Sequence, residues 1–561
     1  MFRGAAGLLA VALAGLLLAG STAGCSVQVQ ANLVADTTEA PTASPAASPT
    51  EAPTDSPTEA PTDSPTEAPT ASTETAGSDP SVAPPAGATP PSASSPVFVP
   101  LVPVTGPWST EGSITRAALV AALTGQGLHP REVLVSAEDL APLAAALGLR
   151  PASNVRAMLP GDIRTRIAKS PAALGIVRAE DVTPAVRALA VGGVTLFGET
   201  RIRDLAAWPL QVPEPPGARP STFGPASLWT MVAGGDVMLD RYVYKRTVID
   251  GLGANYPWNG GTARISSTFC CGWPGLRIVR GARVGSPGTV RNLLKRADVA
   301  LVNLEGPAPD NFRWHPHGLV FTMDPALLTG LRNAGIDVVS LANNHIRNGG
   351  SRGVLDTIRN LDALGIRHAG AGRNSTVARR PAWLSAAGLR IAVLAYNGVG
   401  TTPNATSTSA GAARLSLAAA RADIRAARAA GADVVIVVPH WGIEYTDRIT
   451  SQQATLGPAL LQAGADLVLG GHSHWAGPIR VTSGRLIVYS LGNLVFDLVH
   501  DARTQQGMLV EMTFTGRRLA QVTLHPTLIV GSVQPNLTTP TGGGNALLRA
   551  IQAASARVGS P

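Results

Sequence analysis

The chain has 561 residues, is 45% hydrophobic and 15% charged, and carries a formal net charge of +8 at pH 7. With only three cysteines it is not a disulfide-stapled scaffold. Its basic balance would attract polyanions, but no nucleic-acid recognition motif accompanies it, so nucleic acid is not an expected partner.

The N-terminus has the pattern of an export signal. Arg3 precedes an apolar run, Ala5 to Ala19, that is shorter than the roughly 20 residues needed to span a membrane. Small residues then lead to Cys25, in an arrangement that resembles a bacterial lipobox. Residues 1–25 are therefore expected to be a signal peptide, with Cys25 lipidated and the protein anchored outside the cytoplasm to the cell membrane. The alternative is an ordinary cleaved signal with an incidental cysteine.

Two segments of different character follow. Residues 26–96 repeat Pro-Thr-Glu-Ala-Pro-Thr-Asp-Ser and hold almost no large apolar residues, which predicts a disordered linker. Residues 97–220 predict a small α/β module, for which no function is inferred. In it, a capping-box pattern at Ser136–Asp139 precedes an apolar helical run that stops at Gly148.

The third segment, residues 228–528, predicts an α/β fold, because short β-branched runs alternate with helical patterns. The clearest runs are Thr230–Ala233, Val299–Val302, Val338–Leu341, Val434–Val438, Leu467–Leu469 and Leu486–Leu491. Polar residues follow each run, and ligands of open α/β sheets bind at the carboxyl ends of the strands. Residues 529–561 are expected to be a C-terminal tail. The adjacent Cys270 and Cys271 are expected to be free thiols or a labile pair.

The polar residues at these strand ends are of the types that bind metals. They are Asp236, Glu305, Asn344, His345, His440, His472 and His474. Carboxylates, amide oxygens and imidazoles suit divalent ions such as Mn, Zn or Fe(II). Each motif alone has a structural explanation; Asp236, for example, follows two glycines and could simply stabilise a turn. The occurrence of all these residues directly after predicted strands favours a metal site.

The motifs around these residues resemble those of the CapA family of poly-γ-glutamate capsule-synthesis proteins, over about Thr230 to Asp497. The matching motifs are Gly-Asp-Val-Met-Leu, Asn-Leu-Glu-Gly-Pro, Ala-Asn-Asn-His, His-Trp-Gly-x-Glu-Tyr, Gly-His-Ser-His and Tyr-Ser-Leu-Gly-Asn-Leu-Val-Phe-Asp. That family is similar to calcineurin-like metallophosphoesterases. The resemblance therefore implies a four-layer αββα metallophosphatase-like sandwich, preceded by the small α/β module and the linker.

The resemblance also implies residue roles. One metal position would use Asn344, His440 and His472, and a second would use Asp236 and His474. Glu305 would bridge the two positions, and His345 would face the substrate as the catalytic residue. Metallophosphoesterases begin with Asp-x-His, whereas this chain has Met238 at the third place, so the second position lacks one of its nitrogen ligands. One divalent metal (Mn, Zn or Fe) is therefore expected to bind tightly and a second only weakly.

Two functions follow from these observations. The first is a metal-dependent hydrolase of capsule biosynthesis that processes poly-γ-glutamate, another cell-wall polyanion or a phosphoester. The second is a non-enzymatic component that binds, exports or anchors the polymer together with the capsule-synthesis machinery.

Overall fold

The computed structural model describes residues 97–126, 131–170, 172–270 and 277–559. The predicted signal peptide with Cys25, the predicted linker and Cys271 lie outside these residues. Cys270 is disulfide-bonded, which excludes the free thiol for this residue. Among the described residues, no helix combines the length and the apolar character that a membrane crossing requires.

The described part of residues 97–220 contains one mixed sheet with strand order β4-β3-β5-β1-β6, in which β8 also pairs with β1. Its strands are β1 (Phe98–Thr105), β3 (Val133–Ser136), β4 (Val155–Met158), β5 (Leu174–Arg178), β6 (Arg187–Ala188) and β8 (Gln211–Pro213). The small pair β2 (Ser113–Ile114) and β7 (Ala190–Val191) and the helices α1 (Arg116–Leu123), α2 (Leu140–Leu147) and α3 (Pro160–Lys169) complete this α/β module.

The predicted capping box of α2 does not form. Ser136 ends β3, and the helix begins only at Leu140 with no side-chain cap. The reason is that both oxygens of the Asp139 carboxylate accept hydrogen bonds from the buried Arg178 guanidinium at 2.9 to 3.0 Å. The helix ends at Gly148, which has the left-handed conformation expected of a C-cap glycine (φ 63°).

Two larger sheets form the second part of the molecule. Across the larger sheet the strands are β11 (Arg277–Arg283), β10 (Thr262–Cys270), β26 (Gln534–Thr538), β25 (Arg518–Val530), β24 (Gln506–Thr515), β9 (Leu228–Val237), β12 (Val299–Leu304), β13 (Val338–Ser340) and β14 (Arg367–Ala369), with β23 (Asn493–Val495) paired to β9. Across the smaller sheet they are β16 (Ala382–Ala386), β17 (Leu389–Asn397), β19 (Val434–His440), β20 (Leu467–Leu469), β22 (Arg485–Val488) and β21 (Ile479–Thr482). All six predicted strand runs overlap strands of these sheets, although the run Leu486–Leu491 continues three residues beyond β22.

The two sheets pack face to face. Alternate residues of β9 show this: Met231 and Ala233 join a cluster that contains apolar residues of both sheets, whereas Val232 joins the cluster on the opposite face. Trp229 and Phe514 stack in the layer between the sheets, with ring centroids 4.1 Å apart. Each such fully buried side chain stabilises the fold by about 1.5–3 kcal/mol, so the inter-sheet layer holds the two sheets together.

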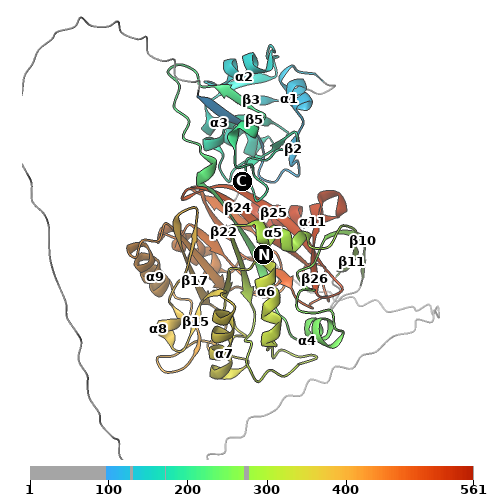
Figure 1. Cartoon of the computed structure of the whole chain (residues 1–561), viewed down its shortest axis with the longest axis vertical. Coiled ribbons are helices and arrows are strands. Elements are labelled where there is room, and N and C mark those ends of the chain that lie inside the picture. Colours follow the sequence, from blue (N-terminus) through green and yellow to red (C-terminus); the bar gives the residue numbers. More distant parts are fainter. Residues whose placement is uncertain (1–96, 127–130, 171, 271–276, 560–561) are drawn as a thin grey trace, which may run out of the picture. The chain divides into compact units, whose positions relative to one another are not determined.

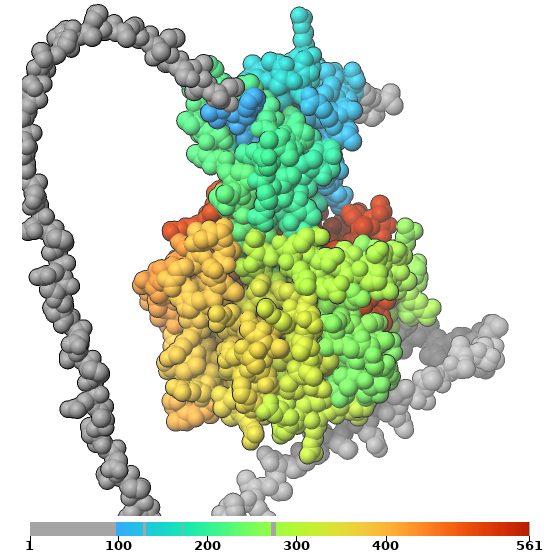
Figure 2. Space-filling model, viewed as in Figure 1, coloured from blue at the N-terminus to red at the C-terminus, as the bar shows by residue number. Residues whose placement is uncertain are grey.

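Helices cover both outer faces. The outer face of the larger sheet packs against α5 (Thr289–Arg296), α6 (Leu328–Ala334) and α7 (Gly350–Ala363). These helices stand toward the viewer in Figure 1, and their atoms contribute to the front of the space-filling view in Figure 2. The outer face of the smaller sheet packs against α9 (Leu417–Ala429) and α10 (Ser451–Gln462). The layers are therefore helix, sheet, sheet, helix, which confirms the predicted αββα sandwich.

The segment after residue 528, expected as a tail, contains β26 and the helix α11 (Gly544–Ala556). β26 pairs with β25 and β10 of the larger sheet. Leu547 and Ile551 lie one helical turn apart and are buried in the inter-sheet cluster. The sandwich therefore extends beyond residue 528. Two further helices, α4 (Arg241–Tyr244) and α8 (Ser375–Ala378), and the pair β15 (Ala371–Gly372) and β18 (Gly411–Ala412) lie in connections.

Candidate metal centre

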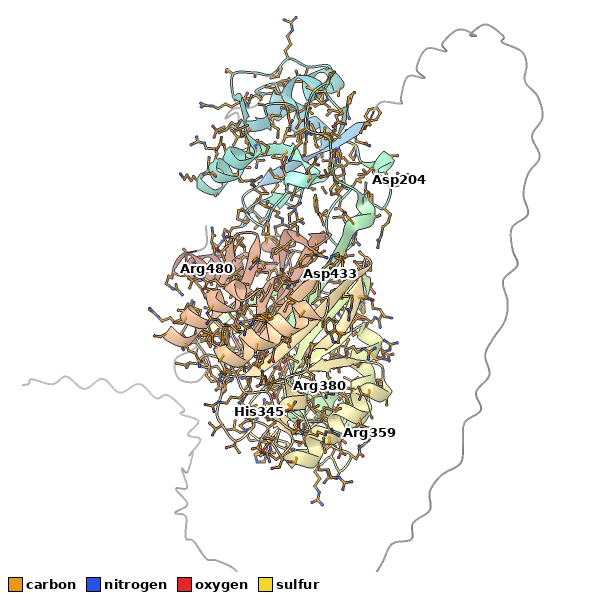
Figure 3. The ribbon with its side chains drawn as sticks, turned by 90° about the vertical axis from the view of Figure 1, so that its left-hand side faces the viewer. Asp204, His345, Arg359, Arg380, Asp433 and Arg480 are labelled. Carbon is orange, nitrogen blue, oxygen red and sulfur yellow. The ribbon has the colours of Figure 1, made fainter. Side chains whose placement is uncertain are left out.

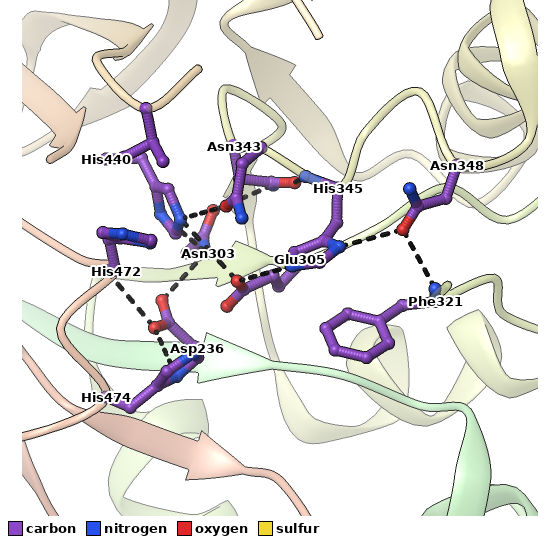
Figure 4. A network of polar contacts seen from close by, with 12 residues as sticks. Asp236, Asn303, Glu305, Phe321, Asn343, His345, Asn348, His440, His472 and His474 are labelled. Carbon is purple, nitrogen blue, oxygen red and sulfur yellow. Dashed lines mark hydrogen bonds and ion pairs between the residues drawn. The ribbon is translucent and has the colours of Figure 1, made fainter. Parts of the chain in front are cut away.

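The predicted site residues lie at one end of the sandwich, where strands of both sheets finish. β9, β12 and β13 are parallel neighbours in the larger sheet, and β17, β19 and β20 are parallel in the smaller one. Asp236 is the second-last residue of β9, Glu305 directly follows β12, and His440 is the last residue of β19. Because parallel strands finish at the same edge, these side chains converge with those of the loops after β13 and β20, as Figure 4 shows.

Asp236 is completely buried and held by hydrogen bonds. Its Oδ1 accepts from Asn303 Nδ2 at 2.8 Å, and its Oδ2 accepts from the backbone N–H of His472 at 3.4 Å. Burial raises the pKa of Asp236 to about 6. The Cβ of any larger residue at position 471 would lie 3.0 Å from Asp236 Oδ1, so Gly471 lets the backbone of the His472 loop approach the carboxylate.

Glu305 is completely buried, and neither oxygen of its carboxylate has a hydrogen-bond partner. Burial and the neighbouring charge of Asp236 raise the pKa of Glu305 well above its usual range. Its Oε1 lies 3.7 Å from His440 Nε2 and 4.0 Å from His345 Nε2. A buried carboxylate without partners is strongly unfavourable unless a cation or a proton compensates it.

His440 lies beside another predicted ligand. Its Nε2 is 2.8 Å from the Oδ1 of Asn344, and its ring centroid is 4.9 Å from that of His472. Burial lowers the pKa of His440 well below its usual range, so the ring is neutral, as a metal ligand must be.

His472 and His474 occupy a turn with an unusual backbone. Their φ angles are +91° and +56°, a region that non-glycine residues rarely adopt and that is often found at functional sites. Burial lowers the pKa of His472 to about 4 and that of His474 to about 3. The buried Nδ1 of His472 has no hydrogen-bond partner, whereas Nδ1 of His474 is 2.9 Å from the Oδ1 of Asn493.

His345 is oriented by an amide. Its Nδ1 donates to the Oδ1 of Asn348 at 2.9 Å, and the same oxygen accepts the backbone N–H of Phe321. The ring packs on Phe321 with centroids 4.1 Å apart. Since Nδ1 carries the hydrogen, Nε2 is left with a free lone pair toward Glu305. Burial lowers the pKa of His345, which favours this neutral form.

Met238 does not contribute to the site. Its side chain is buried in a small cluster with Phe321, Phe496 and Ile529, and its sulfur accepts the backbone N–H of Asp240 at 3.1 Å. The position that holds a nitrogen ligand in metallophosphoesterases therefore supplies apolar packing here.

Amide side chains that the sequence analysis did not select connect the site. Asn303 donates to Asp236, lies 3.5 Å from His440 Nδ1 and accepts from Asn343. Asn493 orients His474, as Asn348 orients His345. Asn303 and Asn493 lie within or beside strands whose ends carry predicted ligands, which is the signal that could have identified them.

The described residues contain one group whose donor atoms are spaced for a metal ion. Asp236, Glu305 and His474 each offer one ligand atom, and these atoms lie within 4.8 Å of one another. His440 adjoins this group through Glu305, and Asn344 adjoins it through His440. The unpartnered oxygens of Glu305 and Nδ1 of His472 are the buried polar atoms that a divalent cation would satisfy, so the donor set fits such an ion.

The affinity of the site for metal is expected to decrease as the pH is lowered, because its carboxylates become protonated. Asp236 binds a proton below about pH 6, whereas His472 and His474 stay neutral down to about 4 and 3. Below pH 6 metal must therefore displace the proton of Asp236 as well as any proton on Glu305, whose pKa is also raised, so its affinity should fall by at least about tenfold per pH unit there. Calorimetric titration of the metal-free chain with Mn²⁺ between pH 5 and 7 measures this. Equal affinities at the two ends of that range would contradict it.

A two-sheet α/β sandwich with carboxylates, an amide and imidazoles gathered at its strand ends defines a metallophosphatase-like domain. Residues 230–498 match the family model described as "Bacterial capsule synthesis protein PGA_cap". This domain is accordingly similar to the CapA family of capsule-synthesis proteins, as the sequence motifs predicted.

Individual relatives agree with this assignment. The chain is 27% identical over 290 residues to the capsule biosynthesis protein CapA of Bacillus anthracis, covering 50% of this chain and 63% of that protein. It is 28% identical over 225 residues to the PGA biosynthesis protein CapA of Bacillus subtilis (strain 168), covering 40% and 59%. The chain thus spans about three fifths of these curated relatives. Among solved structures, the calcineurin-like phosphoesterase YfkN from Bacillus subtilis aligns with 58% of this chain and 99% of its own, at 13% identity and a TM-score of 0.31.

Proposed function

We propose that this chain acts in capsule biosynthesis and that its sandwich domain is a divalent-metal-dependent hydrolase of an anionic polymer, such as poly-γ-glutamate, or of a phosphoester. The relatives in Bacillus are described as capsule and PGA biosynthesis proteins, which supports the setting. The formal charge of +8 suits an anionic substrate and partner.

The observation that carries the proposal is the state of Glu305. A completely buried carboxylate without a hydrogen-bond partner is unfavourable unless a cation or a proton compensates it. It lies between Asp236 and His440, which are themselves oriented by amides. A divalent ion would account for all three side chains, and Glu305, Asp236 and His440 would help to hold it.

The chemistry follows from the residues around that centre. When bound, a divalent ion activates water and stabilises negative charge on the group under attack. His345 Nε2, which carries no hydrogen in this tautomer, can accept a proton from the attacking water and return it to the leaving group as the bond to the substrate breaks. The hydrogen bond from Nδ1 to Asn348 keeps the ring in that tautomer.

The second candidate is a non-enzymatic component that binds, exports or anchors the polymer. Met238 favours it, because the buried thioether leaves the position of Asp236 and His474 without its usual second nitrogen ligand. In this case the metal would have a structural role or would hold a polymer terminus.

Turnover by the full chain separates the two candidates. Metal-loaded protein is expected to hydrolyse a generic phosphodiester or poly-γ-glutamate and to lose that activity with a chelator. His345→Asn is expected to retain metal and to lower turnover by about 10²- to 10⁴-fold, because only proton transfer is removed. Normal metal content with no turnover of either substrate would refute the hydrolase and favour the polymer-binding component.

We also propose that the protein is exported and held at the cell membrane through a lipid on Cys25, where capsule polymer is assembled. The motivation is the lipobox-like Cys25 after a signal-like segment. A fatty-acid probe should label the wild-type protein, and Cys25→Ser should release it into the medium. An unlabelled wild-type protein with another N-terminus would exclude the anchor.

A further inference from the structure

A second polar cavity of about 360 Å³ lies in the sandwich domain, outside the metal centre. Its walls are the loop after β19, the first residues of β21, the residue after β22 and the end of α11. Three arginines, Arg448, Arg480 and Arg557, line it, and Asp447 is the one carboxylate among its lining residues. Figure 3 shows Arg480 and His345 at clearly separate places in the domain.

The cavity carries an excess of positive charge. Asp447 pairs with Arg557 at 3.0 Å and with Arg503 at 3.5 Å, so its one charge is shared between two guanidinium groups. Within the described residues, Arg448 and Arg480 have no carboxylate within ion-pair distance. Two unpaired arginines beside a cavity favour an anionic ligand.

Two polar donors in the cavity wall lack an acceptor. Tyr489 is 1% exposed, and its hydroxyl hydrogen has no acceptor, because the side chain beside it is Arg480, which can only donate. The buried Nε of the adjacent Arg480 is also without one. Buried donors of this kind are normally satisfied, so a ligand that supplies acceptor oxygens would complete both.

Short contacts connect this cavity to the metal centre. The Tyr445 ring stacks on His474 at 5.8 Å, and the backbone N–H of Tyr445 donates to the Ser473 carbonyl at 2.9 Å. Arg448 lies three residues further along the same loop, which is at most about 11 Å of extended chain. On the other side, Tyr489 stacks on Trp441, the residue after His440, with centroids 6.1 Å apart.

We propose that this cavity is a subsite for a carboxylate of the acidic polymer whose reacting segment lies at the metal centre. This inference rests on the proposed function, since it assumes a polymeric anion. The guanidinium forks of Arg448 and Arg480 match carboxylate geometry, and the Tyr489 hydroxyl supplies a further donor. A polymer with repeated carboxylates engages both places, which strengthens its binding, whereas a small phosphodiester engages only the metal centre.

Polymer affinity of the full chain tests the subsite. Arg480→Gln and Arg448→Gln are each expected to weaken binding of poly-γ-glutamate oligomers by about tenfold. Turnover of the small phosphodiester is expected to stay unchanged, and Arg480→Lys is expected to restore part of the affinity. Arg380→Gln, an exposed arginine remote from this cavity, is the matched control and should bind like the wild type.

Unchanged poly-γ-glutamate affinity in both glutamine variants would overturn the proposal. A loss confined to polyphosphate, tested in parallel, would overturn the carboxylate assignment. The same measurements on metal-free protein separate this inference from the proposed hydrolase. If Arg480→Gln weakens polymer binding and the metal-loaded wild type turns over neither substrate, the subsite stands and the hydrolase fails.

Discussion

Glu305→Gln is expected to leave the full chain folded and to lower its divalent-metal content to about a tenth of the wild-type value or less. Glu305 is the one carboxylate that faces both expected metal positions: it groups with Asp236 and His474, and it lies 3.7 Å from His440. An amide of the same shape keeps the packing but loses the charge that binds the ion. Metal analysis after gel filtration measures the effect.

The thermal stability of the metal-free protein provides an independent reading. Because Glu305 is buried without a partner, removing its charge should not lower the Tm of metal-free protein and should remove the additional stability that metal gives the wild type. Glu511→Gln is the matched control, since Glu511 is also buried but is hydrogen-bonded to His525. Wild-type metal content in Glu305→Gln would show that the ion, if present, binds elsewhere.

The histidines distinguish the two positions. The family resemblance assigns the tight metal to Asn344, His440 and His472, whereas the compact group of donor atoms contains His474. Loss of the tight metal in His440→Ala and His472→Ala, with retention in His474→Ala, would support the assignment from the resemblance. The reverse pattern would place the tight ion between Asp236, Glu305 and His474.

Gly235→Ala is expected to destabilise the sandwich by about 3 kcal/mol or more and to abolish metal binding. A Cβ at position 235 would lie 1.8 Å from the carbonyl oxygen of Gly492, which is far inside contact distance. That same carbonyl accepts the backbone N–H of Asp236 at 2.9 Å. The strand pair can therefore relieve the clash only by moving Asp236 away from the other ligands.

Gly224→Ala is the control for this variant. Gly224 has an extended backbone (φ −134°), and a Cβ there would meet no atom within 4 Å. Its Tm should match that of the wild type, whereas that of Gly235→Ala should fall by at least several degrees. A Gly235→Ala protein with wild-type Tm and metal content would contradict the close approach of the two strands.

The buried strands and the convergence of the site were predictable from local patterns, whereas the four-layer sandwich was expected from the family resemblance. Runs such as Val434–Val438 alternate between two buried faces, and the polar residues directly after them must lie at a sheet edge. The structure places Asp236, Glu305 and His440 at that edge. The sequence alone also showed that position 238 supplies no nitrogen ligand, because the residue there is methionine.

Features that depend on distant residues were not predictable in the same way. Asp139 could cap α2 by its sequence position, but it pairs with Arg178, which lies 39 residues further along the chain. The amide of Asn303 connects Asp236 to His440 only when both sheets are assembled. α11 packs into the inter-sheet layer through Leu547 and Ile551, and the sequence pattern around them does not predict a strand. The arginine-lined cavity forms only where the loop after β19, strand β21 and helix α11 meet.

Titration of the metal-free full chain with Mn²⁺ and with Zn²⁺ at pH 7 tests the central claim, that the buried carboxylates and imidazoles at the strand ends form a metal centre. One tight equivalent per chain is expected, with a second only at high metal concentration because Met238 supplies no ligand. The tight equivalent should disappear in Glu305→Gln. A chain that binds neither ion, or that binds them equally well without Glu305, would contradict the account.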